Sequence, residues 1–592
     1  MEPMHTRDAH TRLLLRGPRI GSNVAHSAEL NFIDSITVEA WVNAGESRAE
    51  AMQEIVSKWA PLASFDSFEA YDAGHTAGMD TTGFFGAVFD GRCIYFVPQH
   101  DTKTRHGKVL RFDTHGGFKN PASWQAYDAG NTDGLNTKGY YGAVFDGRFV
   151  FFVPRRDPGS FHTRVLRLDT RGEFTNSQSW SAYDTGLGNR SYQSAAFDGR
   201  YIYFSPGHAS IPKSSVKEPP RCASPAVTGM NPNFYLIGNS LVVRHDTRGE
   251  FQDPKNWATF DVADTSGLDT NDYDGASFDG RYVYFAPLST GNVLRYDTRG
   301  EFTDKRNWSA YDIKPLGMKL CVGAVFDGRH VYFVPYGETQ AVIRCDVRGE
   351  FADPKSWSAY EFAKTKGMTT RGFDGGMFDG RYVYFVPYYD GVDFFHGVAL
   401  RYDTTGAFAD PKSWTTHDAG FVDGLKTTGF NAGASDGRYL YFAPWNDGSA
   451  FPKAIVGNGR VLRYDTIGNR GSFSLRFCDY GHNGGLCAAV PGPRFLVNTD
   501  EGVRSVAANR ALPAGRHHLA GVYDGRSIQL YIDGELANEQ SATGRIVAND
   551  MPLSVGKMLG GKAEFDGTIE AIRISDCARD AAWVRSQHRA MA

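Results

Sequence analysis

The feature that most constrains the fold is a repeat of Phe-Asp-Gly-Arg followed by an aromatic stretch. It first occurs at residues 89–92, and in the last copy serine replaces the phenylalanine. The intervals between the repeated aspartates are 56, 52, 81, 48, 52 and 57 residues, so one unit carries a large insertion. A repeat of this length indicates a solenoid, a propeller or an array. The seven aspartates are Asp90, Asp146, Asp198, Asp279, Asp327, Asp379 and Asp436.

Each unit divides into four short strands. In the second unit they are expected at residues 141–145, 149–153, 165–169 and 179–184. Asp-Gly between the first two strands favours a tight hairpin, because both residues tolerate positive φ. Pro154 ends the second strand. Four short antiparallel strands per unit are typical of a β-propeller blade.

The first strand of every unit carries a pair of small residues. Innermost strands of a propeller converge on a narrow axis, so small side chains are expected there. Seven pairs predict seven blades. The pairs are Gly86-Ala87, Gly142-Ala143, Ser194-Ala195, Gly275-Ala276, Gly323-Ala324, Gly375-Gly376 and Ala432-Gly433.

The count of outer strands predicts how the ring closes. A segment that resembles a fourth strand, residues 67–72, precedes the first unit. The last unit ends at its third strand, residues 461–465. We therefore expect residues 66–73 to complete the seventh blade, which would place the two ends of the propeller side by side.

The segments outside the repeat have strand patterns of their own. Residues 36–42 alternate between apolar and polar, and further strands are expected at 54–59 and 472–477. Asp-Gly hairpins follow in residues 518–525 and 530–534.

Together with Phe565–Glu570, these segments resemble the laminin-G-like jelly rolls of the concanavalin A-like lectin superfamily. The resemblance implies an all-β chain in which a seven-bladed β-propeller is inserted into a concanavalin A-like (LamG-like) β-sandwich jelly roll. The predicted domains are a discontinuous jelly roll, residues 1–60 and 469–592, and a propeller, residues 61–468.

Composition limits the classes of function. The formal net charge is -4, with basic residues spread along the chain, which argues against a nucleic-acid partner. No apolar run is long enough to span a bilayer, and residues 1–17 lack the apolar core of a signal peptide. Jelly rolls of this type are commonly extracellular, which conflicts with the lack of a signal-peptide core. The sequence therefore does not assign a localisation. The sequence does not indicate an oligomeric state.

Neither a disulfide framework nor a cofactor is predicted. The seven cysteines are an odd number and widely scattered. Only Cys478 and Cys487 are close enough in sequence for a local bridge, and two free thiols fit equally well. Jelly rolls of this family often hold calcium, but no ligand set can be identified here.

The variable loops are the expected binding region. The Asp-Gly-Arg turns lie on one face of the propeller and are nearly uniform, whereas the loops on the opposite face vary. Aromatic rings beside polar side chains suit sugars, whose C–H faces stack on rings while their hydroxyls need directed hydrogen bonds. In the alternative, the rings plug the channel mouth and the charges are solvated. The predicted ligand-binding residues are Phe85, Tyr141, Gln193, Asp274, Asp374, Asn431, His100, Arg155, His162, Tyr388 and Trp445. The segments after the second strands also contribute Arg156, His208, Tyr336, Tyr389, Asp390, His396 and Asp447 to this face.

The uniform residues are expected to be structural. Seven equivalent copies of Asp-Gly-Arg point to turn geometry and salt bridges between blades. The repeated tryptophan of the fourth strand is expected to pack between blades. No catalytic residue and no metal site is assigned, because zinc-protease and serine-hydrolase motifs are absent from the sequence.

Three functions follow from these patterns. The first is a non-enzymatic protein that binds glycans or a protein partner through the variable face. The second is a carbohydrate-active enzyme, since the repeat also resembles seven-bladed polysaccharide lyases, which use His, Tyr and Arg in the axial cleft. Convergence of Tyr141, His100, His162 and Arg155 in one cleft would favour that reading. The third is a structural component of a larger assembly.

Overall fold

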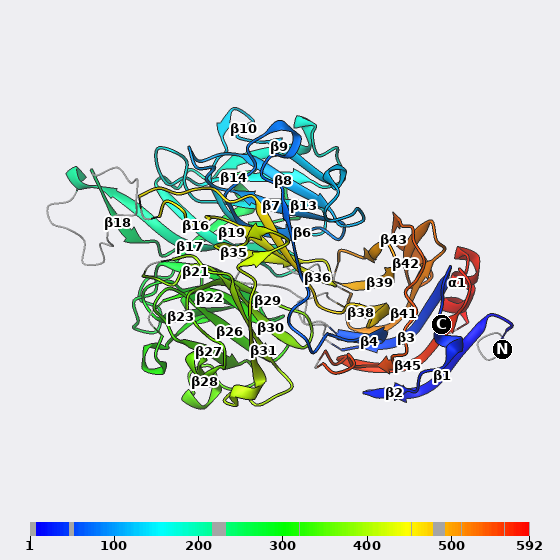
Figure 1. Ribbon diagram of the computed structural model, residues 1–592. Coiled ribbons are helices and arrows are strands. Elements are labelled where there is room, and N and C mark those ends of the chain that lie inside the picture. The colour runs from blue at the N-terminus through cyan, green and yellow to red at the C-terminus, as the bar shows by residue number, and fades with distance from the viewer. Residues whose placement is uncertain are drawn as a thin grey trace.

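The chain is all-β, with a seven-bladed propeller inserted into a β-sandwich jelly roll (Figure 1). The computed structural model describes residues 8–590 except 20, 46–52, 216–232, 319, 393, 452, 478–491, 511 and 562. Cys478 and Cys487 therefore lie outside the described residues. Within the described part, the single α-helix is α1 (Ala581–Arg589), and no helix has the length and apolarity to cross a membrane.

Two six-stranded antiparallel sheets form the jelly roll, with an apolar core between them. The order of the first is β1 (Thr11–Arg19), β45 (Gly567–Ser575), β3 (Ile36–Ala44), β41 (Gly515–Tyr523), β42 (Ser527–Ile532) and β43 (Glu535–Ser541). The order of the second is β2 (Ser22–Val24), β44 (Leu553–Val555), β4 (Gln53–Trp59), β38 (Gly471–Phe477), β39 (Pro493–Thr499) and β40 (Gly502–Ala507). Because β4 pairs with β38, the propeller occupies the connection between two neighbouring strands.

Each blade is an antiparallel sheet whose strands follow one another in order from the axis to the outer edge. The first strands are β6 (Phe84–Phe89), β12 (Tyr140–Phe145), β16 (Arg190–Phe197), β21 (Tyr273–Phe278), β25 (Cys321–Phe326), β29 (Phe373–Phe378) and β35 (Phe430–Ser435). The second are β7 (Cys93–Pro98), β13 (Phe149–Pro154), β17 (Tyr201–Pro212), β22 (Tyr282–Pro287), β26 (His330–Pro335), β30 (Tyr382–Pro387) and β36 (Tyr439–Pro444).

The outer two strands complete each sheet. The third are β8 (Lys108–Asp113), β14 (Arg164–Asp169), β19 (Leu241–Asp246), β23 (Asn292–Asp297), β27 (Ala341–Asp346), β31 (Val398–Asp403) and β37 (Arg460–Asp465). The fourth are β9 (Trp124–Asp128), β15 (Trp180–Asp184), β20 (Trp257–Asp261), β24 (Trp308–Asp312), β28 (Trp357–Glu361), β32 (Trp414–Asp418) and β5 (Phe68–Asp72). In the third blade, β17 is twelve residues long and also pairs with β18 (Phe234–Gly238).

The seventh blade combines both ends of the propeller segment. Strand β5 pairs antiparallel with β37, with Phe68 opposite Tyr464. The blade therefore has three strands from the end of the repeat and one from before its start. The domain limits at residues 60 and 469 remain a prediction.

Neighbouring blades interlock through arginine and aromatic side chains. The third strand of each blade places a guanidinium over a phenylalanine of the next blade, a geometry in which the ring face attracts the cation. The seven pairs are Arg111–Phe174, Arg167–Phe251, Arg244–Phe302, Arg295–Phe351, Arg344–Phe408, Arg401–Phe65 and Arg463–Phe118, at 4.0–4.6 Å from guanidinium carbon to ring centre. The tryptophans of the fourth strands also stack across blades, as in Tyr360–Trp414 at 4.2 Å.

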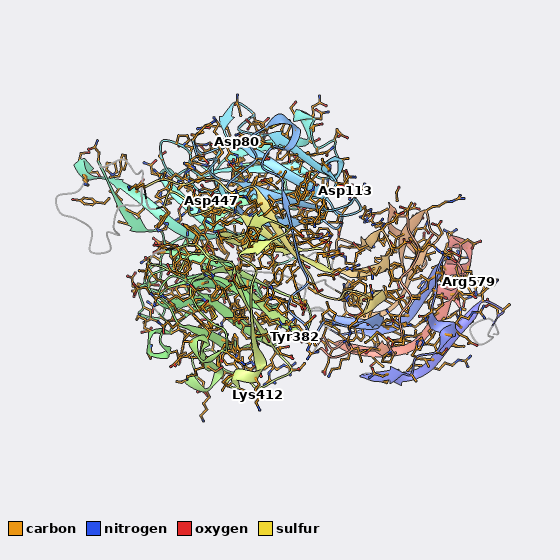
Figure 2. The ribbon with its side chains drawn as sticks, in the orientation of Figure 1. Asp80, Asp113, Tyr382, Lys412, Asp447 and Arg579 are labelled. Atoms are coloured by element: carbon orange, nitrogen blue, oxygen red, sulfur yellow. The ribbon has the colours of Figure 1, made fainter. Side chains whose placement is uncertain are left out.

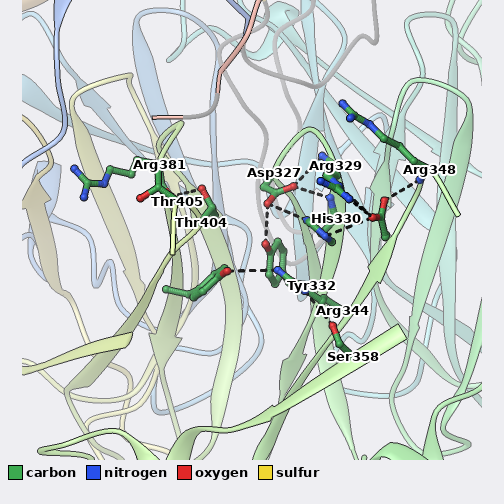
Figure 3. A network of polar contacts seen from close by, with 12 residues as sticks. Asp327, Arg329, His330, Tyr332, Arg344, Arg348, Ser358, Arg381, Thr404 and Thr405 are labelled. Carbon is green, nitrogen blue, oxygen red and sulfur yellow. Dashed lines mark hydrogen bonds and ion pairs between the residues drawn. The ribbon is translucent and has the colours of Figure 1, made fainter. Parts of the chain in front are cut away.

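The Asp-Gly-Arg turns form a polar network inside each blade. In the fifth blade, Asp327 accepts hydrogen bonds from the backbone N–H groups of Arg329 and His330 and from the Tyr332 hydroxyl, at 2.8, 2.6 and 2.7 Å (Figure 3). The Arg329 guanidinium pairs with Asp346 at the end of the third strand of the same sheet. The predicted salt bridges between blades are therefore wrong: these bridges lie within a blade, because the turn arginine reaches across the second strand to the end of the third.

The jelly roll covers the face that carries these turns. The Ser505 hydroxyl donates to the Gly91 carbonyl at 3.1 Å, and Arg438 donates to Asn498 at 2.6 Å. In Figure 2, Asp113 lies on the side of the propeller towards the jelly roll, whereas Asp447, in a variable loop, lies on the opposite side. The variable face is thus the one that the jelly roll leaves uncovered.

The contact between the jelly roll and the propeller can be tested at Gly147. Its φ is +101°, and a Cβ built there would collide with the Asn509 carbonyl oxygen of the jelly roll. We expect Gly147→Ala to destabilise the contact between the domains by about 1–3 kcal/mol, since a rigid backbone atom must move. Faster hydrogen exchange in residues 502–509 would report it. Gly199→Ala is the matched control, because its φ is +95° and nothing lies within 4 Å. Equal exchange in both variants would contradict the prediction.

Candidate functional site

The first strands begin at the axis on the variable face, and three of their side chains meet around one carboxylate. The Tyr141 hydroxyl donates to Asp274 Oδ2 at 2.9 Å, and Gln193 Nε2 donates to the same oxygen at 2.6 Å. Tyr141, Gln193 and Asp274 come from the second, third and fourth blades and are almost fully buried. We call this cluster and the groups around it the axial mouth.

A second carboxylate lies on the other side of the axial mouth. Asn431 Nδ2 of the seventh blade donates to Asp374 Oδ2 of the sixth at 2.7 Å. Oδ1 of Asp274, Oδ1 of Asp374 and Oδ1 of Asn431 have no hydrogen-bond partner among the described residues. Buried polar atoms are normally paired, so these three acceptors require an explanation.

Burial changes the charge of both carboxyl groups. It raises the pKa of Asp274 to about 7, although Arg155, Tyr141 and Gln193 oppose the shift. It also raises the pKa of Asp374 well above its usual value, and the charge of Asp274 adds to that effect. At neutral pH the two carboxyl groups therefore retain protons that an exposed aspartate would lose.

Aromatic rings surround this polar cluster. Phe85 lies 4.6 Å from Tyr141 and 4.1 Å from Trp445 between ring centres, and Tyr388 lies 5.3 Å from Phe395. These five rings are each at most 8% exposed, so they pack mainly against one another. The partly exposed rings in the same cluster are Tyr336, Tyr389 and Phe451.

Arginines line the mouth beside the rings. The half-buried Arg155 places its guanidinium 4.5 Å from the Tyr141 ring centre and 5.2 Å from that of Phe85. Burial lowers the pKa of Arg105 to about 9, and the charges of Arg155 and Arg156 add to the shift. Burial and Arg155 also lower the pKa of Arg156. Three cations therefore lie close enough to repel one another.

The two predicted histidines differ in their placement. His100 is near the mouth, with its ring centre 6.4 Å from that of Trp445, and burial followed by Arg105 lowers its pKa to about 4. His162 bonds to the Lys138 carbonyl at 2.7 Å, and its contacts in the described structure are within its own blade. His106 and His396 make the equivalent bond in their blades. His162 therefore belongs to the blade framework rather than to the axial mouth.

Four further residues belong to the mouth: His208 and Arg156 lie in the predicted binding region, whereas sequence reasoning missed Arg105 and Asp272. His208 Nδ1 lies 2.7 Å from Gln193 Oε1, and its Nε2 lies 3.4 Å from Asp272. Arg105 and Arg156 complete the basic group. Arg105 lies in the variable loop between the second and third strands of the first blade, which is a signal that could have found it; Asp272 directly precedes β21.

A family model matches the longer of the two pieces that form the jelly roll. Residues 462–585 match the Laminin_G_3 family model, described as the concanavalin A-like lectin/glucanases superfamily, which confirms the predicted resemblance. No curated protein matches the chain. A solved structure titled "Crystal Structure of Mitotic Checkpoint Complex" is similar at 9% identity and a TM-score of 0.39, over 68% of this chain and 94% of that one. A likeness this weak carries no argument, so the propeller rests on the sheet topology. Both folds are compatible with binding and recognition.

Proposed function

We propose that this chain is a non-enzymatic binding protein that recognises glycans through the axial mouth of the propeller. The observation that carries the proposal is the combination of Tyr141, Gln193 and Asp274 from three blades with unpaired oxygens and partly exposed rings in one place. Sugars need both directed hydrogen bonds and ring faces. The mouth also lies on the face that the jelly roll leaves uncovered.

The enzyme alternative has weaker support. A carboxyl group with a pKa near 7 beside a tyrosine hydroxyl is an arrangement that acid–base catalysis uses. However, His162 does not join Tyr141 and Arg155, so the residue set implied by the likeness to lyases does not assemble. The glycan experiment therefore includes a measurement of product release.

A glycan array with the intact protein tests the proposal. We expect binding to a restricted glycan class, with no release of shortened products from acidic or neutral polysaccharides. Tyr336→Ala removes a partly exposed ring that stacks on Tyr388 at 5.8 Å, and should weaken binding about twofold to tenfold, since stacking contributes about 0.5–1.5 kcal/mol.

Phe421→Ala is the control for this variant. It removes a ring that is 71% exposed on the β33 (Phe421–Val422) hairpin beside β5, at the outer edge of the seventh blade. Its binding should match that of the unchanged protein. If the protein bound no glycan class, the proposal would be wrong. If it released shortened products, the enzyme alternative would replace the proposal.

A further inference from the structure

The arginines of the axial mouth indicate which glycans fit it. The Arg155 guanidinium lies over the rings of Tyr141 and Phe85, and the Arg105 guanidinium donates to the Gln99 side chain. Neither arginine forms an ion pair in the described structure, whereas the seven turn arginines all pair with an aspartate at 2.6–2.8 Å. Burying arginine without a carboxylate costs free energy. A group of cations that repel one another favours an anion.

The nearby acids do not neutralise this group. Asp101 pairs with Lys108, and Asp157 pairs with Arg164, so both carboxylates already have a cationic partner. Asp274 and Asp374 face the mouth, but burial favours their neutral forms. His100 is uncharged at neutral pH. The one other acid of the mouth among the described residues, Asp272, is outnumbered by the three arginines, so the mouth presents net positive charge near pH 7.

We propose that the axial mouth binds the anionic group of an acidic glycan, a carboxylate or a sulfate, through Arg105, Arg155 and Arg156. The proposal rests on the proposed function and narrows its ligand class. Guanidinium groups donate paired N–H bonds in a geometry that matches a planar carboxylate or a sulfate. The half-buried Arg155 is reachable from solvent, and the partly exposed rings of Tyr336, Tyr389 and Phe451 in the same cluster offer a surface for the sugar.

The buried carboxyl groups give the site a pH signature. As pH rises through about 7, Asp274 loses its proton and adds a negative charge close to Arg155. Asp374, which also faces Arg155, ionises at higher pH because burial and, after it, the charge of Asp274 raise its pKa. The other charged groups around the pair are Asp272 and, in contact with it, His208. Affinity for an anionic glycan is therefore strongest below pH 7 and falls above it.

Calorimetric titration of the intact protein with three hexasaccharides tests the inference: oligogalacturonate, a sulfated heparin-type oligosaccharide and neutral maltohexaose. We expect binding of at least one acidic oligosaccharide, with affinity that falls with added salt and between about pH 6 and about pH 8.5. The comparison of oligogalacturonate with the sulfated sugar distinguishes carboxylate from sulfate.

Matched variants test whether the axial mouth is the site that binds acidic glycans. Arg155→Met and Arg105→Met should each weaken acidic-glycan binding about tenfold to a hundredfold, as expected for a hydrogen bond to a charged group. Arg248→Met, an exposed arginine in a turn on the opposite face, should not change it. Asp274→Asn keeps this position neutral and should flatten the pH dependence between about pH 6 and about pH 8.5.

The outcomes separate this inference from the broader proposal. Neutral glycans that bind as tightly as acidic ones, with no loss in Arg155→Met, would overturn the anionic site and leave glycan binding in place. An acidic peptide such as polyglutamate that binds more tightly than every glycan would overturn the glycan assignment. If the protein bound no glycan, both the anionic site and the glycan-binding function would be wrong.

Discussion

Replacing Asp279 by alanine is expected to lower the free energy of unfolding by about 3–5 kcal/mol, because it leaves one buried and two part-buried donors without their acceptor. Asp279 accepts the backbone N–H groups of Arg281 and Tyr282 at 2.9 and 2.7 Å and the Tyr284 hydroxyl at 3.0 Å. The side chain is 5% exposed, so water cannot replace it. Denaturation in urea at neutral pH would measure the effect.

The arginine of the same turn is the matched control. Arg281 pairs with Asp297 at 2.7 Å, but its side chain is 45% exposed. Solvent screens such a pair, and Arg281→Ala should cost about 0–1 kcal/mol. Similar losses in the two variants would show that the turn is not stabilised by the aspartate's hydrogen bonds.

A methyl group at Gly275 is expected to destabilise the propeller by about 3–5 kcal/mol. Its φ is +115°, and a Cβ would lie 2.5 Å from the Gly323 Cα and 2.8 Å from the Gly323 nitrogen in the next blade. Strain at positive φ costs about 1–2 kcal/mol, and overpacking against backbone adds a further 1–3 kcal/mol or so.

Gly199→Ala isolates the collision at Gly275 from the backbone strain. It has a comparable φ with open space around it, so it should show only the strain of about 1–2 kcal/mol. The melting temperature and the urea midpoint of the two variants would measure the difference. If Gly275→Ala were no less stable than Gly199→Ala, the crowding between innermost strands could not explain the small residues there.

The sequence predicted the fold well because the information was repeated. Seven copies of a four-strand pattern specify the blades, and the missing fourth strand identified the segment that pairs with β37. The salt bridges were predicted with the wrong partners. Equivalent positions in a repeat do not reveal whether Arg329 reaches the aspartate of its own blade, Asp346, or the equivalent aspartate of a neighbouring blade. Only the twist and spacing of the strands decide that.

The axial mouth could be predicted only in part. Equivalent positions in the repeat correctly identified the residues that begin the innermost strands, but no pattern joins Tyr141 to Asp274, which are 133 residues apart. His162 could have been excluded, because His106 and His396 precede third strands in the same way. Arg105 precedes His106, but Phe161 and Phe395 occupy the equivalent positions, so the repeat does not predict a basic side chain there.

The closure of both domains has a consequence for synthesis of the chain. Glu69 of β5 bonds to Arg463, 394 residues later, and Thr37 of β3 accepts a bond from the backbone of Arg579, 542 residues later. The early strands β1, β3 and β5 must therefore stay unpaired until distant partners leave the ribosome, which adds roughly 5–20 residues each second. The five β-strands before the first complete blade would spend tens of seconds as exposed edges, so we expect nascent chains to need chaperone protection until residue 575 has emerged.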